Sequence, residues 1–157
     1  MVLLDYLKWR NDVSLEASPF NDIDNVILSC LAYIDFGEFF FNYDDSYTLE
    51  EIFELFCKNH SLDEIRESKQ FTERIALLLE EMVQADRFKG TKVVHYAEDL
   101  DKEKVKQFAA VTFILPDGTN YISFRGTDST IIGWKEDFLM TFMADTEGAK
   151  EAVKYIN

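Results

Sequence analysis

The spacing of apolar residues changes at Gly90, and this change points to a mixed fold. Before Gly90, apolar residues recur every three or four positions, most regularly in a predicted helix from about Thr72 to Asp86. Such spacing is expected of helices with one buried face. After Gly90, Lys92–Ala97 alternates and Phe108–Leu115 is apolar on both faces, which is typical of a strand covered on both sides. The sequence therefore predicts helices first and a sheet second.

Helix start signals divide the first part of the chain into several helices. A short helix is expected from Val2 to Arg10, and Asn21 or Asp22 can cap the next one. Thr48-Leu-Glu-Glu51 and Ser61-Leu-Asp-Glu64 have the pattern of a capping box, in which two side chains satisfy free backbone N–H groups. We therefore predict a helical N-terminal subdomain over residues 1–90.

Three strands are expected in the remaining part, residues 91–157. The first two, Lys92–Ala97 and Phe108–Leu115, are joined by a polar connection, Glu98–Lys104. Pro116-Asp-Gly-Thr119 is a turn signal, because proline presets φ and glycine accepts the left-handed conformation. It would join the second strand to Tyr121–Phe124 as an antiparallel hairpin. Residues 133–144 and 147–156 are expected to be helices.

The composition indicates an acidic globular protein. Hydrophobic residues make up 47% and aromatic residues 15% of the chain, enough for the core of an ordinary domain. The formal net charge of -14 disfavours nucleic acids and anionic membrane surfaces as partners. No apolar run of about 18 residues occurs, and the start at Met1 lacks the features of a signal peptide. We therefore expect a cytoplasmic protein with no integral membrane segment.

The two cysteines, Cys30 and Cys57, lie on the apolar stripes of predicted helices. We expect two buried free thiols, because nothing indicates an oxidising compartment. No CxxC or His-x3-His spacing occurs, so a zinc site is not expected.

The segment from Tyr121 to Asp128 combines a strand with a glycine bend. The strand would end before Gly126, and the polar residues that follow could start a helix containing Trp134 and Phe138. A strand that turns at glycine towards a helix points backbone N–H groups into a small concave space. Such a space suits an anion, or an oxygen that becomes one during a reaction.

Phe124-Arg-Gly-Thr-Asp128, with Trp134 and Phe138, resembles the Phe-Arg-Gly-Ser/Thr segment of the class 3 (triacylglycerol) lipases. The closest likeness is to lipase-like bacterial proteins of the Mbeg1-like family, also called DUF2974. Asp5–Arg10 and Pro19–Asp24 resemble the N-terminus of that family. The resemblance implies an α/β fold with a helical subdomain and the first three strands of an α/β-hydrolase-like sheet. It also implies a lipase- or esterase-like serine acyl hydrolase that needs no metal or other cofactor.

The nucleophile elbow of such hydrolases, Gly-x-Ser-x-Gly, does not occur in these 157 residues. The nucleophilic serine and the later Asp and His of a triad are therefore absent from this chain. We interpret the chain as the N-terminal portion of a hydrolase, truncated before the elbow and inactive alone. The alternative is a noncatalytic protein-interaction module of hydrolase ancestry, in which an acidic, aromatic surface binds a partner.

Thr127 is the candidate catalytic residue. In the family, the residue at this position contributes the first oxyanion-hole donor, although it could equally cap the following helix. Gly126, Asp128 and Trp134 are the candidate substrate-binding residues. Trp134 corresponds to the lid region of the class 3 lipases, and it could also belong to the core.

Arg125 is expected to have a structural role. A guanidinium at the end of a strand more often ties a loop to a carboxylate than contacts substrate, and Asp128 or Asp137 could be its partner. The two histidines, His60 and His95, are not expected to be catalytic.

The expected partners are few. An ester or acyl-lipid substrate would bind the full-length form. In the family, the nucleophile strand lies beside the strand that corresponds to Tyr121–Phe124. We therefore expect an open sheet edge there, through which two copies of the chain could associate.

Overall fold

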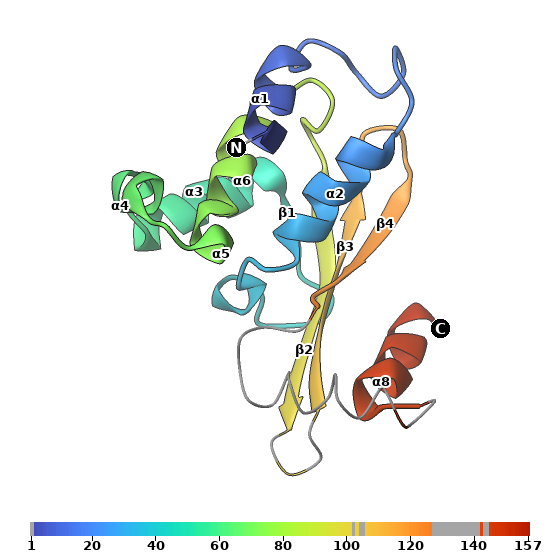
Figure 1. Ribbon diagram of the computed structural model, residues 1–157. Helices are drawn as coiled ribbons and strands as arrows, with labels where there is room; N and C mark the ends of the chain where they lie inside the picture. Colours follow the sequence, from blue (N-terminus) through green and yellow to red (C-terminus); the bar gives the residue numbers. More distant parts are fainter. Residues whose placement is uncertain (1, 102, 104–105, 127–141, 143–144) are drawn as a thin grey trace.

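The computed structural model describes residues 2–101, 103, 106–126, 142 and 145–157. Helices and strands are both present, so the fold is mixed α/β (Figure 1). The helical elements are α1 (Val2–Trp9), α2 (Asp22–Leu31), the 3-10 turn η1 (Phe36–Glu38), α3 (Leu49–Asn59), α4 (Leu62–Glu67), α5 (Phe71–Arg74), α6 (Ala76–Met82) and α8 (Glu147–Ile156). The strands are β1 (Ser46–Thr48), β2 (Lys92–Asp101), β3 (Lys106–Ile114) and β4 (Asn120–Phe124).

The described sheet has four antiparallel strands in the order β1-β2-β3-β4, one strand more than expected. The three predicted strands correspond to β2, β3 and β4, and Gly118 in the turn between β3 and β4 has the expected positive φ of 85°. The additional strand, β1, pairs Ser46 with Val94 and Thr48 with Lys92. A strand of three residues is too short to show alternation of apolar and polar side chains. It is therefore recognised only by its pairing with β2, which is distant in the sequence.

Strand β2 is longer than the sequence indicated. Residues 98–101, expected in a polar connection, continue the pairing, with Asp101 opposite Lys106. His95 and Tyr96 together lie opposite one residue of β3, so β2 contains a bulge, and His95 has a φ of 54°. The bulge shifts the alternation of side chains. Tyr96 therefore lies on the same face as Val93, whereas strict alternation along Lys92–Ala97 would put it on the face of Val94.

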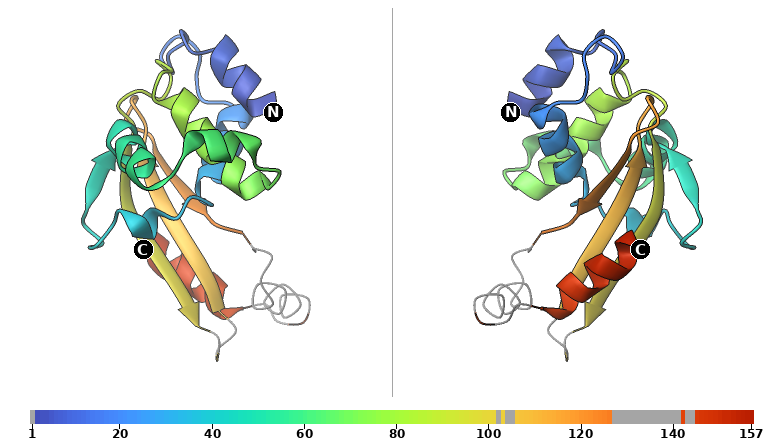
Figure 2. Two further views of the ribbon diagram at one scale, coloured as in Figure 1. Left: turned by 90° about the vertical axis from the view of Figure 1, so that its left-hand side faces the viewer. Right: turned by 90° about the vertical axis from the view of Figure 1, so that its right-hand side faces the viewer.

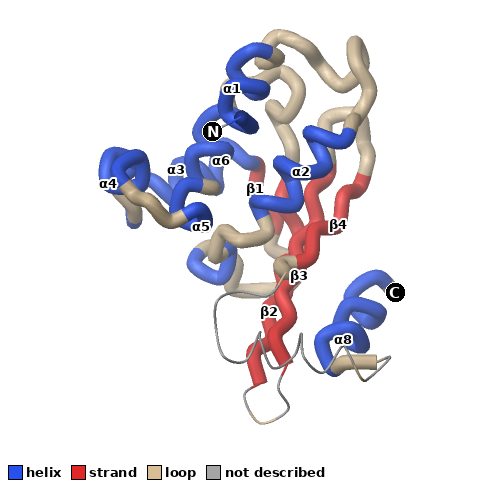
Figure 3. The backbone as a smooth tube through the Cα atoms, in the orientation of Figure 1, coloured by secondary structure: helices blue, strands red, loops and turns tan. Residues whose placement is uncertain are grey.

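Two layers of helices cover the sheet (Figure 2). On one face, Val111 and Phe113 of β3 join a hydrophobic core that also contains residues of α2, η1, α3 and α6. On the other face, Phe108 and Thr112 contact Tyr155 of α8. This confirms that β3 is covered on both sides. Figure 3 shows the sheet between α8 and the helices that precede β2 in the sequence.

Local capping signals place most of the helix starts. Asn21 and Thr48 form capping boxes at α2 and α3, and Ser61 caps α4. The single helix expected from about Thr72 to Asp86 is wrong, because the structure has α5 and α6 separated at Ile75. At this junction the backbone makes the tighter i→i−3 bonds, from Ile75 N to Thr72 O and from Leu78 N to Ile75 O.

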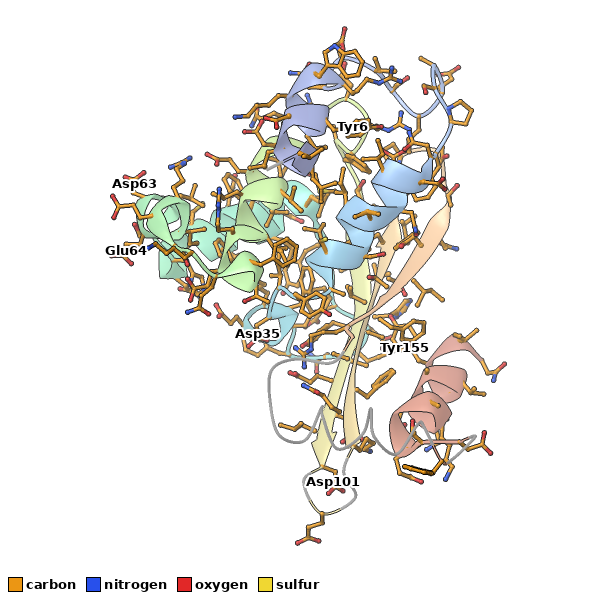
Figure 4. The ribbon with its side chains drawn as sticks, in the orientation of Figure 1. Tyr6, Asp35, Asp63, Glu64, Asp101 and Tyr155 are labelled. Atoms are coloured by element: carbon orange, nitrogen blue, oxygen red, sulfur yellow. The ribbon has the colours of Figure 1, made fainter. Side chains whose placement is uncertain are left out.

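A buried ion pair joins α2 to the segment after α6. Arg87 and Asp24 are 1% and 0% exposed, and the Arg87 Nη2 atom lies 2.5 Å from the Asp24 carboxylate. Tyr6 of α1, labelled in Figure 4, donates a hydrogen bond to the same carboxylate at 3.3 Å. Nothing in the local sequence indicated this pair.

Both cysteines are free thiols, as expected. The expectation that both are buried is wrong, because Cys57 is exposed and Cys30 is partly buried. Burial raises the pKa of the Cys30 thiol. None of the described helices is long and apolar enough to span a membrane.

Candidate functional site

The candidate site begins where β4 ends. The Arg125 N–H donates to the Ala109 carbonyl at 2.9 Å, so hydrogen bonding to β3 extends one residue beyond the strand. The next residue, Gly126, lies close to Tyr33, which follows α2. A Cβ atom added at Gly126 would be 2.9 Å from the Tyr33 hydroxyl oxygen. A side chain at this position would therefore displace Tyr33, which explains in physical terms why glycine fits here.

The Arg125 side chain contacts a carboxylate of another strand. Its guanidinium forms an ion pair with Glu98 on β2, although the arginine lies at the end of β4. The sequence pointed to Asp128 or Asp137, and both of these residues lie outside the described ranges. The side chain of Arg125 is 14% exposed and that of Glu98 is 36% exposed, so the ion pair is partly shielded from water.

Tyr96 supports Glu98 from the same strand. The Tyr96 hydroxyl donates to the second carboxylate oxygen of Glu98 at 3.1 Å. Burial, followed by the negative charges of Glu98 and Asp35, raises the pKa of the Tyr96 phenol well above its usual range. The phenol therefore stays protonated and remains a donor at any physiological pH. Tyr96, Glu98 and Arg125 form a chain of polar contacts from the centre of β2 to the bend after β4.

The remaining site residues predicted from the sequence are Thr127, Asp128, Trp134 and Asp137, and all of them lie outside the described residues. Their roles stay predictions. The structure instead adds three residues beside the bend that the sequence did not indicate, namely Tyr33, Tyr96 and Glu98. One signal was available for Glu98. Tyr96 and Glu98 are two positions apart, as residues on one face of a strand are, and this spacing could have extended the predicted strand Lys92–Ala97 into the connection Glu98–Lys104.

The two histidines have local partners. The His60 Nε2 atom lies 2.9 Å from Glu38, and the ring stacks on Phe56 with centroids 4.3 Å apart. His95, in the bulge of β2, packs against Tyr43 with ring centroids 4.8 Å apart. The described part of the chain contains no group of three or more His, Cys, Asp or Glu side chains placed to hold a metal ion.

Ser123, the serine within β4, is buried and donates to the Leu28 carbonyl of α2 at 3.2 Å. This bond fastens β4 to α2. Ser123 therefore has a structural partner in the core.

The described elements define a mixed α/β protein in which the last strand of an antiparallel sheet is followed by Arg125 and Gly126. The second half of this chain matches the model of the Mbeg1-like family, over residues 82–157. The resemblance to the Mbeg1-like family is thereby confirmed for this part of the chain, whereas the resemblance to the class 3 lipases stays a prediction. The resemblance of the N-terminal segments lies before the matched range and stays a prediction. No curated protein and no solved structure matches the chain.

Proposed function

We propose that this chain forms the front part of the active site of a lipase- or esterase-like serine acyl hydrolase. In this proposal, the N–H and hydroxyl groups of Thr127 stabilise the oxyanion that forms when an ester or thioester carbonyl is attacked. Donors that are held in position before the reaction stabilise such an intermediate at no reorganisation cost. Gly126, Asp128 and Trp134 would contact the substrate.

The observation that supports this proposal is the way the chain is held just before Thr127. Three contacts fix the bend: the Arg125 N–H with the Ala109 carbonyl, the Arg125 guanidinium with Glu98, and the close approach of Gly126 to Tyr33. Contacts of this kind pre-organise a backbone, as an oxyanion donor requires.

The proposal also requires a nucleophile. Because these 157 residues contain no Gly-x-Ser-x-Gly motif, the serine, the general base and its orienting acid must come from sequence outside them. We therefore expect this chain alone not to hydrolyse esters by a triad mechanism.

The test is a longer product of the same reading frame that includes a Gly-x-Ser-x-Gly segment. We expect a fluorophosphonate probe to label its serine and short p-nitrophenyl esters to be hydrolysed. Replacing Thr127 with Val removes the hydroxyl donor, and loss of one such donor lowers kcat by about 10²–10³-fold. Thr119→Val, in the turn between β3 and β4, is the control and should keep full activity. Absence of both labelling and turnover in a folded longer product would reject the proposal.

The second candidate function is a noncatalytic protein-interaction module. It is favoured by two aromatic side chains on an acidic surface, Trp9 at 78% and Phe41 at 83% exposed. Exposed aromatic residues are enriched at protein interfaces. Two experiments distinguish the two functions. An interaction module would not be labelled by the fluorophosphonate probe in any longer product. Its partner would no longer bind after Trp9→Ala or Phe41→Ala.

Association of two copies through β4 is a further part of the proposal. In the described sheet, β4 is the last strand in the order, and its outer edge carries no described strand. Free strand edges favour pairing with another chain. We expect concentration-dependent dimers in sizing chromatography. Monomers at all concentrations would contradict this expectation.

A further inference from the structure

A pocket of about 560 Å³ lies between the segment after α2, the end of α3, and helices α4 to α6. One of its lining residues, Tyr33, also approaches Gly126. The volume of the pocket is within the range of small-molecule pockets, about 300–1,000 Å³. Its apolar wall comes from four residues of four different segments: Ile34, Phe56, Ile65 and Ala76. Three of these residues, all except Ile65, are buried in the core, so the pocket rests on the rigid part of the fold.

The charged residues that line this pocket carry one sign. They are Asp35, Glu38, Glu64 and Glu73, and neither lysine nor arginine is among the described lining residues. Asp35 and Glu64 are labelled in Figure 4, where they come from the turn after α2 and from α4. Carboxylates gathered around a partly enclosed space raise the local concentration of cations and exclude anions.

His60 is the one basic residue in the lining, and it already has a partner. Its Nε2 atom lies 2.9–3.1 Å from both carboxylate oxygens of Glu38. Even a fully protonated His60 would offset one of the four carboxylates, so the lining keeps a net negative charge. The Glu64 carboxylate has no side-chain partner among the described hydrogen bonds and ion pairs, which leaves it available to a ligand.

We propose that this pocket binds an organic cation, an ammonium group carried on an apolar or aromatic body. The body would lie against Tyr33 and Ile65, the apolar and aromatic lining residues that are only partly buried, and the ammonium group would lie among the carboxylates. The ring of Tyr33 could add a cation–π contact. A metal ion does not fit, because none of the described acidic and histidine groups has the geometry to hold one. The inference does not depend on the proposed hydrolase function, although the pocket shares Tyr33 with the segment at Gly126.

The first test compares three probes of one shape and different charge: benzylammonium, benzyl alcohol and benzoate. Binding is followed by the methyl NMR signals of Ile34, Ile65 and Ala76 at low ionic strength. We expect benzylammonium to saturate these shifts, and added salt to weaken its binding. Benzyl alcohol should bind about tenfold more weakly, because several partly exposed ion pairs are lost, and benzoate should not bind. Equal binding of the alcohol and the ammonium, or binding of benzoate, would overturn the proposal.

The second test distinguishes binding in the pocket from nonspecific attraction of a cation to the acidic surface. Acidic residues outnumber basic ones by 30 to 16 in this chain, so a control on the same helix is needed. Glu64→Gln should weaken benzylammonium binding about two- to fivefold, the effect of one partly exposed ion pair. Glu67→Gln, which lies on α4 outside the lining, should leave it unchanged. Circular dichroism confirms that both variants fold. Equal weakening by both variants would show a general surface effect and reject the site.

Discussion

Removing the charge of Asp24 should cost a large part of the stability of this protein. Asp24 is 0% exposed and faces Arg87, which is 1% exposed. Arg87 donates from Nε to Asp24 at 2.7 Å and from Nη2 at 2.5 Å, and it also reaches the carbonyl groups of Ser18 at 2.7 Å and Pro19 at 2.9 Å. The guanidinium therefore has no access to water that could replace a lost carboxylate.

The Asp24→Asn variant isolates the charge. The Asn21 N–H donates to one Asp24 oxygen at 2.9 Å within the capping box of α2, and an amide oxygen can accept the same bond. Removing one partner of a buried pair costs about 3–5 kcal/mol, because the other charge is left buried and uncompensated. Whole domains are stable by about 5–15 kcal/mol, so we expect Asp24→Asn to remain folded but to unfold at much lower urea concentration.

A double-mutant cycle tests the reasoning. Arg87→Met should cost a similar amount, and the Asp24→Asn/Arg87→Met double variant should lose clearly less than the sum of the two single losses. Urea unfolding followed by circular dichroism gives each free energy of unfolding. Glu81→Gln is the control, because Glu81 pairs with Lys8 at the surface, where such pairs contribute about 0–1 kcal/mol. Single losses below about 1 kcal/mol, or strict additivity, would refute the account of a buried, coupled pair.

Three other predictions concern the bend and the sheet. Gly126→Ala places a Cβ atom 2.9 Å from the Tyr33 hydroxyl and should destabilise the protein by about 1 kcal/mol. Tyr33→Phe removes that hydroxyl and should restore the stability of Gly126→Ala. Tyr33→Phe should not restore the stability of Gly118→Ala, because there the strain comes from a φ of 85°. Glu98→Gln removes a carboxylate that pairs with Arg125 and should lower the free energy of unfolding in urea by about 1–3 kcal/mol. A loss no larger than that of Glu81→Gln would show that this ion pair does not hold Arg125 in place. Burial raises the pKa of Tyr155 from 10.0 to about 12, so the unfolded chain loses this proton first. The contribution of Tyr155 to stability should be complete below pH 10 and lost as the pH rises through about 12, and Tyr155→Phe, compared with wild type by urea unfolding, should remove this part of the pH dependence.

Local signals in the sequence predicted local structure well. Thr48 and Ser61 were identified as helix starts, and Asn21 was one of two candidates with Asp22, because a cap depends on residues within one turn of it. Gly118 was placed in a left-handed turn conformation for the same kind of reason. The long helix expected from about Thr72 to Asp86 failed because its apolar spacing continues through Ile75, where the backbone hydrogen bonding changes. Periodicity reports which side chains are buried and does not report whether the helix is continuous.

Features that depend on distant partners were not predicted. Strand β1 exists because Ser46–Thr48 can pair with Lys92–Val94, and three residues carry too little pattern to show this alone. The bulge at His95 moves Tyr96 to the helical face, which simple alternation cannot foresee. Glu98, which forms an ion pair with Arg125, lies on β2, two strands away from β4, and nothing in the sequence around Arg125 indicated this contact.

The segment matched by the Mbeg1-like family model is held in place by residues that precede it. The match begins at Met82, yet β2 within it pairs with β1, and Arg87 within it forms an ion pair with Asp24 of α2. At the candidate site, Gly126 approaches Tyr33, which follows α2, and Ser123 donates to Leu28 within α2. The bend that carries the proposed oxyanion donor is thus positioned from two sides, by Glu98 of the sheet and by the helical segment around α2. Substitutions in α2 should therefore alter the bend even though α2 lies outside the matched range.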